Sequence, residues 1–426
     1  MLLEFRTENH RSLRDEQAIT FEASHGKTVP ETQLRSLRGC RQPLLTCTVM
    51  YGANASGKSN LVSAIEFMRD AVVESHRHWE PDGGVPRVPF AWGEKKNQPS
   101  LFEVTLVLEG TRFAYGFTVD DQEVCEEWLF AWPSNRKQVW FERDKKKFKF
   151  GSHMDGPNET VREVTRENAL FLSASAQHGH DALMPLYKWF YRTLSILQSD
   201  RLASTMPRRI RDWLPGTSAD TFSRAISSPM DEFTESRVAS MRSLLQAADF
   251  GIVDIKRVEI ESDNGMASRK RWRIVLQHQA DDDESWLDLD QESAGTKKLF
   301  RLAPYIFDAL ESGGVLFVDE LESSLHPLLG LEVVKLFHSL KTNPRNAQLM
   351  FTTHDTNLLG NPPLLGESAT FRRDQVWFAE KDASGASRIY PLTDYKPRKV
   401  ENLERGYLQG RYGAIPFLER MAQIGE

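Results

Sequence analysis

The segment from Gly52 to Ser59, GANASGKS, constrains the fold more than any other part of the chain. It matches the phosphate-binding loop pattern G-x-x-x-x-G-K-[ST] without a mismatch. An apolar, strand-like run at 44–51 precedes it, and apolar residues at helical spacing over 61–68 follow it. Backbone N–H groups of such a loop and the N-terminus of the next helix together surround phosphate oxygens. The sequence therefore predicts an α/β fold that binds a nucleotide.

The predicted nucleotide-binding residues of this loop are Gly52, Asn54, Ala55, Ser56, Gly57, Lys58, Ser59 and Asn60. The Lys58 ammonium would neutralise charge on the β- and γ-phosphates, so Lys58 is also predicted to be catalytic. The Ser59 hydroxyl would be a ligand of Mg²⁺. ATP and Mg²⁺ are accordingly the predicted cofactors.

A second apolar run, at 315–318, ends in Asp319 and Glu320. A short, wholly apolar run is typical of a buried parallel strand. Asp319 is predicted to complete the Mg²⁺ shell with Ser59, and Glu320 to polarise the attacking water. An acidic pair at a strand end can also be an ordinary solvated turn, but the upstream phosphate loop favours the catalytic interpretation.

The segment 292–296, ESAGT, opens a stretch whose apolar residues recur at helical spacing up to Leu310. Ser293 and Gly295 would then lie at a helix N-terminus, which attracts anions. A domain that already binds the phosphates of a nucleotide at one loop seldom needs a second phosphate site. We therefore predict head-to-tail dimerisation, in which each such segment caps the nucleotide held by the other subunit. The alternative is a serine-capped helix with no further role.

A further apolar strand, starting at 348, ends at His354. A predicted helix at 328–340 separates it from the acidic pair, which makes a βαβ step. Such a step places His354 beside Glu320 at the carboxyl edge of the sheet, where α/β folds bind ligands. His354 is predicted to contact the γ-phosphate and to take part in catalysis.

The order of these motifs, together with SLHP at 324–327, resembles that of the ABC/SMC-like ATPases. The chain is most similar to the bacterial abortive-infection AAA-type ATP-binding family, relatives of RecF and of the OLD nucleases. Segments 5–12, 166–173 and 406–413 are also similar to that family. The resemblance implies a two-lobed P-loop NTPase of ABC/SMC-like head type with a helical insertion.

The resemblance also implies a division of the chain into ATPase lobe one at 1–177, a helical insertion at 178–250, lobe two at 251–396 and a C-terminal tail at 397–426. Helices are predicted at 183–196 and 231–247, within the insertion. Gln177 follows a strand-like run at 170–175. It occupies the place of the Mg²⁺-contacting glutamine in the SMC-like pattern.

Composition bounds the partners and the compartment. The net charge of −6 gives no overall basic surface for nucleic acid. A stretch at 136–150 alternates Lys and Arg with aromatic residues, which favours an ordinary hairpin but leaves nucleic acid open as a partner. No apolar run is long enough to span a bilayer, and the three scattered cysteines fit a reducing cytoplasm. We predict a cytoplasmic protein without a membrane partner.

The family resemblance implies the sensor or motor ATPase of an anti-phage defence system. It would act as a homodimer or higher homo-oligomer with a separately encoded effector. An OLD-type nuclease is a different possibility, but about seventy residues follow His354, fewer than its additional metal-binding domain needs. Glu380 and Asp382 also lack a following Asp-x-Asp. A third possibility is a DNA-repair clamp of RecF or SMC type.

Overall fold

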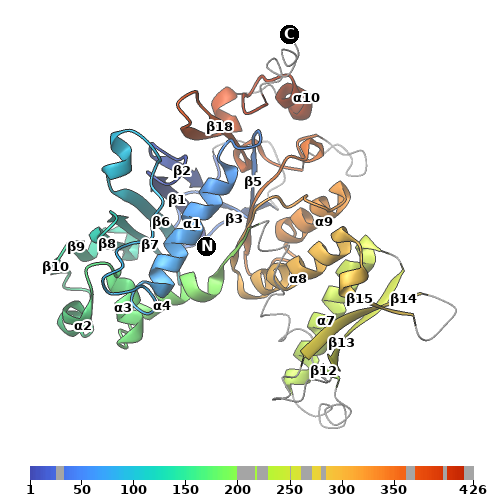
Figure 1. Cartoon of the computed structure of the whole chain (residues 1–426), viewed down its shortest axis with the longest axis horizontal. Coiled ribbons are helices and arrows are strands. Elements are labelled where there is room, and N and C mark those ends of the chain that lie inside the picture. Colours follow the sequence, from blue (N-terminus) through green and yellow to red (C-terminus); the bar gives the residue numbers. More distant parts are fainter. Residues whose placement is uncertain are drawn as a thin grey trace. The chain divides into compact units, whose positions relative to one another are not determined.

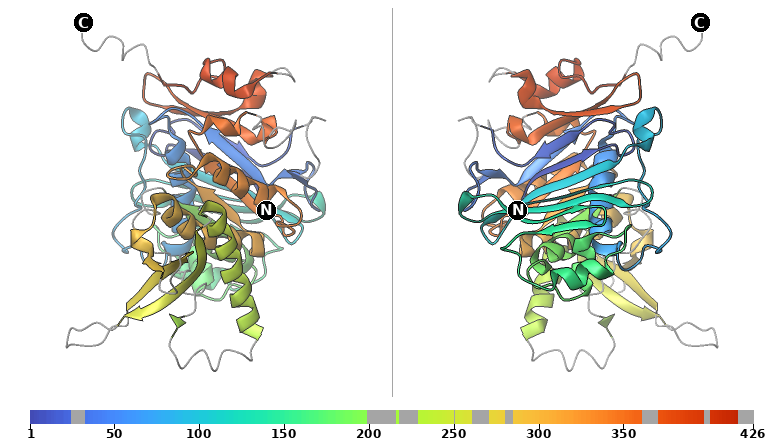
Figure 2. Two further views of the ribbon diagram at one scale, coloured as in Figure 1. Left: turned by 90° about the vertical axis from the view of Figure 1, so that its right-hand side faces the viewer. Right: turned by 90° about the vertical axis from the view of Figure 1, so that its left-hand side faces the viewer.

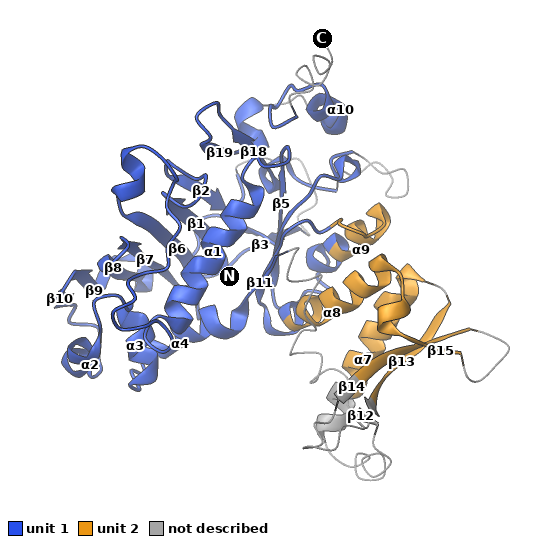
Figure 3. Ribbon diagram, in the orientation of Figure 1, with its two compact units in different colours: residues 1–198, 309–321, 334–426 blue, residues 199–308, 322–333 orange. Residues whose placement is uncertain are grey.

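The computed structural model describes residues 1–24, 33–198, 216–217, 229–249, 251–260, 271–279, 285–360, 370–396 and 401–416. The chain divides into two compact units (Figure 3). Unit 1 contains residues 1–198, 309–321 and 334–426, and unit 2 contains 199–308 and 322–333. In the described residues, no helix combines the length and the apolar character that crossing a membrane requires.

Unit 1 contains a largely parallel sheet. Its strands, in spatial order, are β11 (Leu194–Leu197), β16 (Val315–Val318), β17 (Gln348–Thr352), β5 (Cys47–Tyr51), β18 (Val376–Lys381) and β19 (Ser387–Pro391). Only β19 runs antiparallel to its neighbour. Every residue of β5, β16 and β17 is buried, as expected for strands covered on both faces. The predicted strands before the phosphate loop, the acidic pair and His354 are confirmed, and their carboxyl ends share one edge.

A second sheet of unit 1 is antiparallel, and its strands lie side by side in the right-hand view of Figure 2. In spatial order they are β10 (Lys147–Phe150), β9 (Gln138–Asp144), β8 (Val124–Trp132), β7 (Thr111–Val119), β6 (Ser100–Leu108), β1 (Leu2–Glu8) and β2 (Gln17–Thr20). Glu109 and Gly110, both at positive φ, make the tight turn between β6 and β7. The predicted hairpin there is confirmed. A small pair, β3 (Leu34–Arg35) and β4 (Leu44–Leu45), lies apart, so the predicted strand at 44–51 is in two pieces.

Helix α1 (Lys58–Glu74) joins the two sheets of unit 1 into one core (Figure 1). Its apolar face, including Leu61, Ile65 and Met68, belongs to the same buried cluster as Phe102 of β6 and Phe317 of β16. Burying this face against both sheets holds the start of α1 rigidly at the end of β5. The predicted helix after the phosphate loop is therefore confirmed.

The predicted strand at 170–175 is wrong, because these residues form helix α3 (Phe171–Gln177). The buried Glu127 carboxylate, on β8, accepts hydrogen bonds from the backbone N–H groups of Phe171 and Leu172, at 2.7 and 3.1 Å. An acid at a helix N-terminus satisfies N–H groups that have no partner within the helix. Periodicity alone does not distinguish a short buried helix from a buried strand when the run is apolar. Helices α2 (Asn158–Val164) and α4 (Met184–Lys188) flank α3 in the chain.

The predicted helix at 183–196 is correct only in its first part. After α4, a π-helical turn spans Trp189–Thr193, and residues 194–197 form β11. β11 pairs in parallel with β16. The predicted insertion at 178–250 therefore includes strand β11 of the core sheet, and the two units divide between residues 198 and 199.

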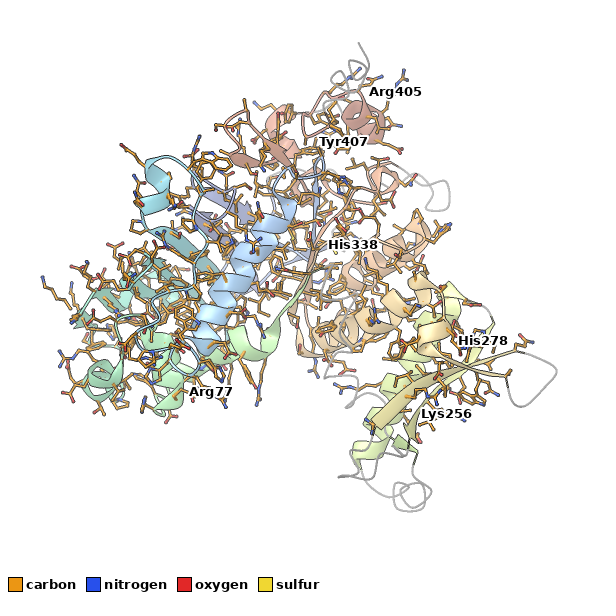
Figure 4. The ribbon with its side chains drawn as sticks, in the orientation of Figure 1. Arg77, Lys256, His278, His338, Arg405 and Tyr407 are labelled. Carbon is orange, nitrogen blue, oxygen red and sulfur yellow. The ribbon has the colours of Figure 1, made fainter. Side chains whose placement is uncertain are left out.

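Unit 2 combines the rest of the predicted insertion with the start of predicted lobe two. Its sheet has the order β12 (Gly216–Thr217), β13 (Ile252–Ile260), β14 (Arg271–His278) and β15 (Trp286–Asp288). Helix α7 (Pro229–Ala248) confirms the helix predicted at 231–247, and Arg242 of α7 pairs with Asp254 of β13 at 2.5 Å. Lys256 of β13, labelled in Figure 4, lies 3.6 Å from the ring centre of Trp286. The predicted boundary at 250 thus falls inside one packed unit.

Two helices contribute residues to both units, α8 (Ala294–Ser312) and α9 (Pro327–His338). Short 3-10 helices lie at Glu94–Asn97, Pro133–Asn135, Leu289–Gln291, Thr356–Leu358, Arg373–Gln375 and Leu392–Tyr395. The predicted C-terminal tail includes α10 (Leu403–Leu408), while 397–400 and 417–426 lie outside the described residues. The Tyr407 ring (Figure 4) packs on Tyr51 and Phe378, with ring centres 5.7 and 5.5 Å apart. The described part of the tail therefore packs against strands β5 and β18.

A buried histidine at the end of α9 makes the stability of unit 1 depend on pH. His338 Nε2 accepts a hydrogen bond from the Gln375 side-chain amide at 3.1 Å, which requires an unprotonated ring nitrogen. Burial, and then the nearby Arg35, lower the pKa of His338 from 6.5 to about 3. Between these pH values the unfolded chain binds a proton that the folded chain does not. Folding stability is therefore complete above pH 6.5 and falls as the pH drops below it.

We expect His338→Gln to weaken this dependence, since glutamine cannot gain a proton. Urea unfolding at pH 5, 6 and 7 should give a slope that is shallower by about 1 kcal/mol per pH unit below pH 6. The buried His10, whose pKa is also lowered to about 3, leaves a residual slope in both proteins. Equal slopes for the two proteins would show that His338 is not the group responsible.

Candidate functional site

The phosphate loop connects the end of β5 to the start of α1 in a shape that few residues can adopt. Ala55 has φ 62° and Gly57 has φ 109°, so successive N–H groups turn toward one side of the loop. A Cβ atom at Gly57 would collide with the Ser387 hydroxyl, and one at Gly52 with the Ala379 carbonyl. Close packing therefore requires glycine at both positions, and at Gly57 the backbone conformation requires it as well.

Lys58 is the cation of the loop, and it is 5% exposed. Its ammonium donates to the carbonyl oxygens of Gly52 and Ala53, at 2.8 and 3.1 Å, and to His354 Nε2 at 3.1 Å. An ammonium only donates, so His354 Nε2 is unprotonated and accepts. The structure thus brings together the two predicted residues Lys58 and His354, which lie 296 positions apart in the chain.

The acidic pair follows β16, and Thr352 at the end of β17 holds both residues. The Thr352 hydroxyl donates to Asp319 Oδ1 at 2.6 Å and accepts from the Glu320 N–H at 2.8 Å. Asp319 is buried, whereas Glu320 is partly exposed and has φ 53°. A left-handed conformation costs energy for a non-glycine residue and occurs often at functional sites. Sequence reasoning missed Thr352, although it belongs to the strand that was predicted to end at His354.

These elements enclose a cavity of about 330 Å³. Its lining residues are Asn54, Ala55, Ser56, Gly57, Lys58, Ser59, Asn60, Glu320, His354 and Lys381. The loop N–H groups and the Lys58 ammonium suit phosphate oxygens. The exposed Ser59 hydroxyl and the Asp319 carboxylate are the hard oxygen donors that Mg²⁺ prefers. The residues present therefore fit a nucleotide with Mg²⁺.

Gln177 does not lie at this cavity, and its predicted contact with Mg²⁺ is corrected. The neighbouring His178 has its Nε2 atom 3.3 Å from that of His76, just beyond the C-terminal end of α1. The helical rise puts that end about 24 Å from Lys58. Gln177 ends a helix, α3, instead of following a core strand.

Gln198, unlike Gln177, follows a strand of the core sheet. It directly follows β11, and Leu197 at the end of that strand accepts a hydrogen bond from the Asp319 N–H at 2.8 Å. The Gln198 side chain donates to Glu66 of α1. The sequence signal for this strand was the four-residue run 194–197 directly before a glutamine. It was missed because residues 183–196 were predicted to be helical.

Two serines from opposite ends of the chain support the phosphate loop from behind, and sequence reasoning missed both. Ser387 Oγ donates to the Ser56 carbonyl at 2.7 Å and lies 2.7 Å from Ser12 Oγ. The Asn60 side chain donates to the same Ser12 oxygen. The turn after β1 and the β18–β19 hairpin thereby hold the loop in its conformation.

The predicted second anion site, Ser293 and Gly295, belongs to unit 2. Ser293 Oγ accepts from the Thr296 N–H at 3.0 Å and so caps the N-terminus of α8. A Cβ at Gly295 would lie 2.7 Å from the Ser324 carbonyl. Glu292 Oε1 lies 2.6 Å from Nε2 of His278, a residue of β14 that Figure 4 labels. The segment is thus a serine-capped helix start with an exposed Ser293. This geometry fits both a shared anion site and a helix cap with no further role.

The basic stretch at 136–150 forms the β9–β10 hairpin, which is the interpretation that the sequence favoured. Its cations are largely paired with carboxylates, in the pairs Arg143–Glu127, Lys145–Glu123, Lys146–Glu167 and Lys149–Glu142. Lys137 lies 3.6 Å from the ring centre of Phe130. This pairing neutralises four of the seven cations of the stretch, which reduces the positive charge that it offers to nucleic acid phosphates.

Comparison with known proteins gives one matching family model and similar solved structures. A family model described as "AAA domain, putative AbiEii toxin, Type IV TA system" matches residues 47–360. No curated protein matches the chain. A solved SMC head bound to the C-terminal winged-helix domain of ScpA is similar at 13% identity and TM-score 0.44, covering 92% of this chain and 97% of that one. An SMC head with an extended coiled coil, bound to the C-terminal domain of ScpA derived from Pyrococcus furiosus, is similar at 11% identity and TM-score 0.42, covering 92% and 96%.

Proposed function

The chain belongs to this AAA-domain family, and from that premise we propose that it hydrolyses ATP. The observation that carries the proposal is the hydrogen bond between Lys58 and His354. Both residues line one cavity, and Glu320 lines it too. A cation, a neutral imidazole and a carboxylate then face the same bound phosphate chain. Phosphate release by the purified chain tests it.

Each residue has one task in the proposed reaction. Lys58 neutralises negative charge as it develops on the leaving phosphates. Glu320, oriented by the hydrogen bond from its N–H to Thr352, accepts a proton from the attacking water. His354 would donate a hydrogen bond to an oxygen of the terminal phosphate through a ring nitrogen that carries a proton. Ser59 and Asp319 would hold Mg²⁺, which would supply positive charge to stabilise the phosphate chain.

We further propose that two copies associate head to tail, and that each Ser293–Gly295 segment completes the site of the other subunit. The exposed Ser293 at the start of α8 supports this, because a helix N-terminus binds anions. The dimer would be the sensor or motor of an anti-phage defence system that acts through a separately encoded effector. The family's description as a toxin of a toxin–antitoxin system supports the defence role.

The two carboxylates considered for a nuclease are committed to internal hydrogen bonds. Glu380 accepts from the Tyr390 hydroxyl at 2.9 Å. Asp382 accepts from the Ser384 hydroxyl and from the Ala386 N–H, at 2.6 and 2.9 Å. This arrangement disfavours an OLD-type metal site there. A repair clamp of RecF or SMC type would use the same ATP chemistry, so a phage-challenge assay separates it from the defence role.

Shared sites predict complementation between two inactive variants. Ser293→Arg should block hydrolysis while sparing ATP binding, because its bulk prevents the heads from engaging. Mixed with Lys58→Ala, each mixed dimer has one site with both lesions and one intact site. Random pairing makes about half of the dimers mixed, so phosphate release should recover to about a quarter of the wild-type rate.

Ser293→Ala is the matched control, because it removes the same helix cap without adding bulk. It should cost about 1 kcal/mol of stability and lower hydrolysis less than Ser293→Arg does. If the mixture is no more active than the sum of its two components, each chain works alone and the shared-site proposal fails.

A further inference from the structure

A second lysine lines the cavity that contains Lys58. Lys381 is the last residue of β18, next to the turn that leads into β19, and the two strands form a hairpin of unit 1. It lines the cavity together with the phosphate loop, Glu320 and His354. Lys58 is buried and already donates to three acceptors, whereas Lys381 is exposed to solvent.

The charge of Lys381 has no carboxylate partner among the described residues that would neutralise it. Its two sequence neighbours are acidic but are used elsewhere. Glu380 accepts from Tyr390, on the opposite face of the strand, and Asp382 closes the turn with Ser384 and Ala386. An unneutralised ammonium at a cavity wall favours an anion inside the cavity.

The hairpin that carries Lys381 is fastened directly to the phosphate loop. Lys381 pairs in register with Ser387, and Ser387 donates to the Ser56 carbonyl at 2.7 Å. The turn is held from outside as well, since the Trp92 indole N–H donates to the Ser384 carbonyl at 2.9 Å. The backbone position of Lys381 relative to the loop is therefore set before any ligand binds, and only its flexible side chain must order.

We propose that Lys381 is a second phosphate-binding cation of this site, which contacts the phosphate chain of the nucleotide from the β18–β19 hairpin. The inference rests on the proposed nucleotide site and adds a residue to it that the loop motif does not contain. Lys58 binds the phosphates at the loop, while Lys381 binds them from the neighbouring hairpin. Its main contribution is to affinity for the nucleotide.

The test measures binding of a fluorescent ATP analogue, and of the corresponding ADP and AMP analogues, to the full chain. Lys381→Ala should weaken ATP binding about tenfold, the loss expected for one partly exposed charge-assisted hydrogen bond. The loss should shrink from ATP to AMP, and Lys381→Arg should restore binding. Arg388→Ala is the matched control, because Arg388 is an exposed cation of the same hairpin that lies over the Tyr390 ring and does not line the cavity.

Lys381→Ala with wild-type affinity, in a preparation where Lys58→Ala has lost binding, would overturn the role of Lys381 and leave the nucleotide site intact. Equal losses in Lys381→Ala and Arg388→Ala would also overturn it, because they would reflect overall charge. If the wild-type chain itself binds no ATP analogue, the proposed function fails instead. Thermal unfolding of each variant shows whether the hairpin remains folded.

Discussion

Lys58→Ala is expected to abolish ATP hydrolysis, with a loss of at least about a hundredfold. Lys58 is the buried cation that the loop carbonyls and His354 hold in place at the floor of the cavity. Without it, charge on the departing phosphates develops with no ammonium beside it. Phosphate release and equilibrium ATP binding should both be measured, and we expect both to fall.

Lys147→Ala is a control for loss of one positive charge, because Lys147 is an exposed residue of the β9–β10 hairpin. It should hydrolyse ATP at the wild-type rate. Substantial ATPase activity retained by Lys58→Ala, with the protein free of contaminating ATPases, would mean that this loop is not the site of hydrolysis.

Glu320→Gln should bind ATP normally and turn it over about a hundred to ten thousand times more slowly. The amide preserves the shape of the side chain but cannot take a proton from water. The backbone hydrogen bond to Thr352 does not depend on the side chain, so the residue should keep its left-handed conformation. We expect a trapped, ATP-bound dimer, which light scattering coupled to gel filtration can detect.

Glu109→Gln is a matched control for this variant. Glu109 is an exposed glutamate that also has a positive φ, of 49°, but it lies in the β6–β7 turn. It should hydrolyse ATP like the wild type. Normal turnover in Glu320→Gln would place the general base on another residue, while loss of ATP binding would indicate a structural role for Glu320.

The sequence by itself determined the parts of the site that depend on neighbouring residues. The phosphate loop is one continuous segment, and its glycines, lysine and serine must occur at that spacing for the backbone to turn. The strands before Asp319 and His354 could be predicted because both are buried and are apolar, β16 throughout and β17 in its three central residues. The end of each such strand places the polar residue that follows it at the carboxyl edge of the sheet.

The tertiary structure decided which glutamine lies at that edge. The runs 170–175 and 194–197 are both short and apolar, and each precedes a glutamine. Glu127, from a distant strand, caps the first run as helix α3, while pairing with β16 draws the second into the core sheet. Neither partner can be found by inspecting the run itself.

Long-range pairing also decided what surrounds the loop. Ser387 and Lys381 reach it because β18 pairs with β5, more than 300 positions away in the chain, and β19 pairs with β18. No local pattern marks a serine or a lysine for such a contact. A motif sets the residues that form a phosphate loop, whereas the order of strands in the sheet sets which side chains meet it, because strand order depends on the packing of the whole unit.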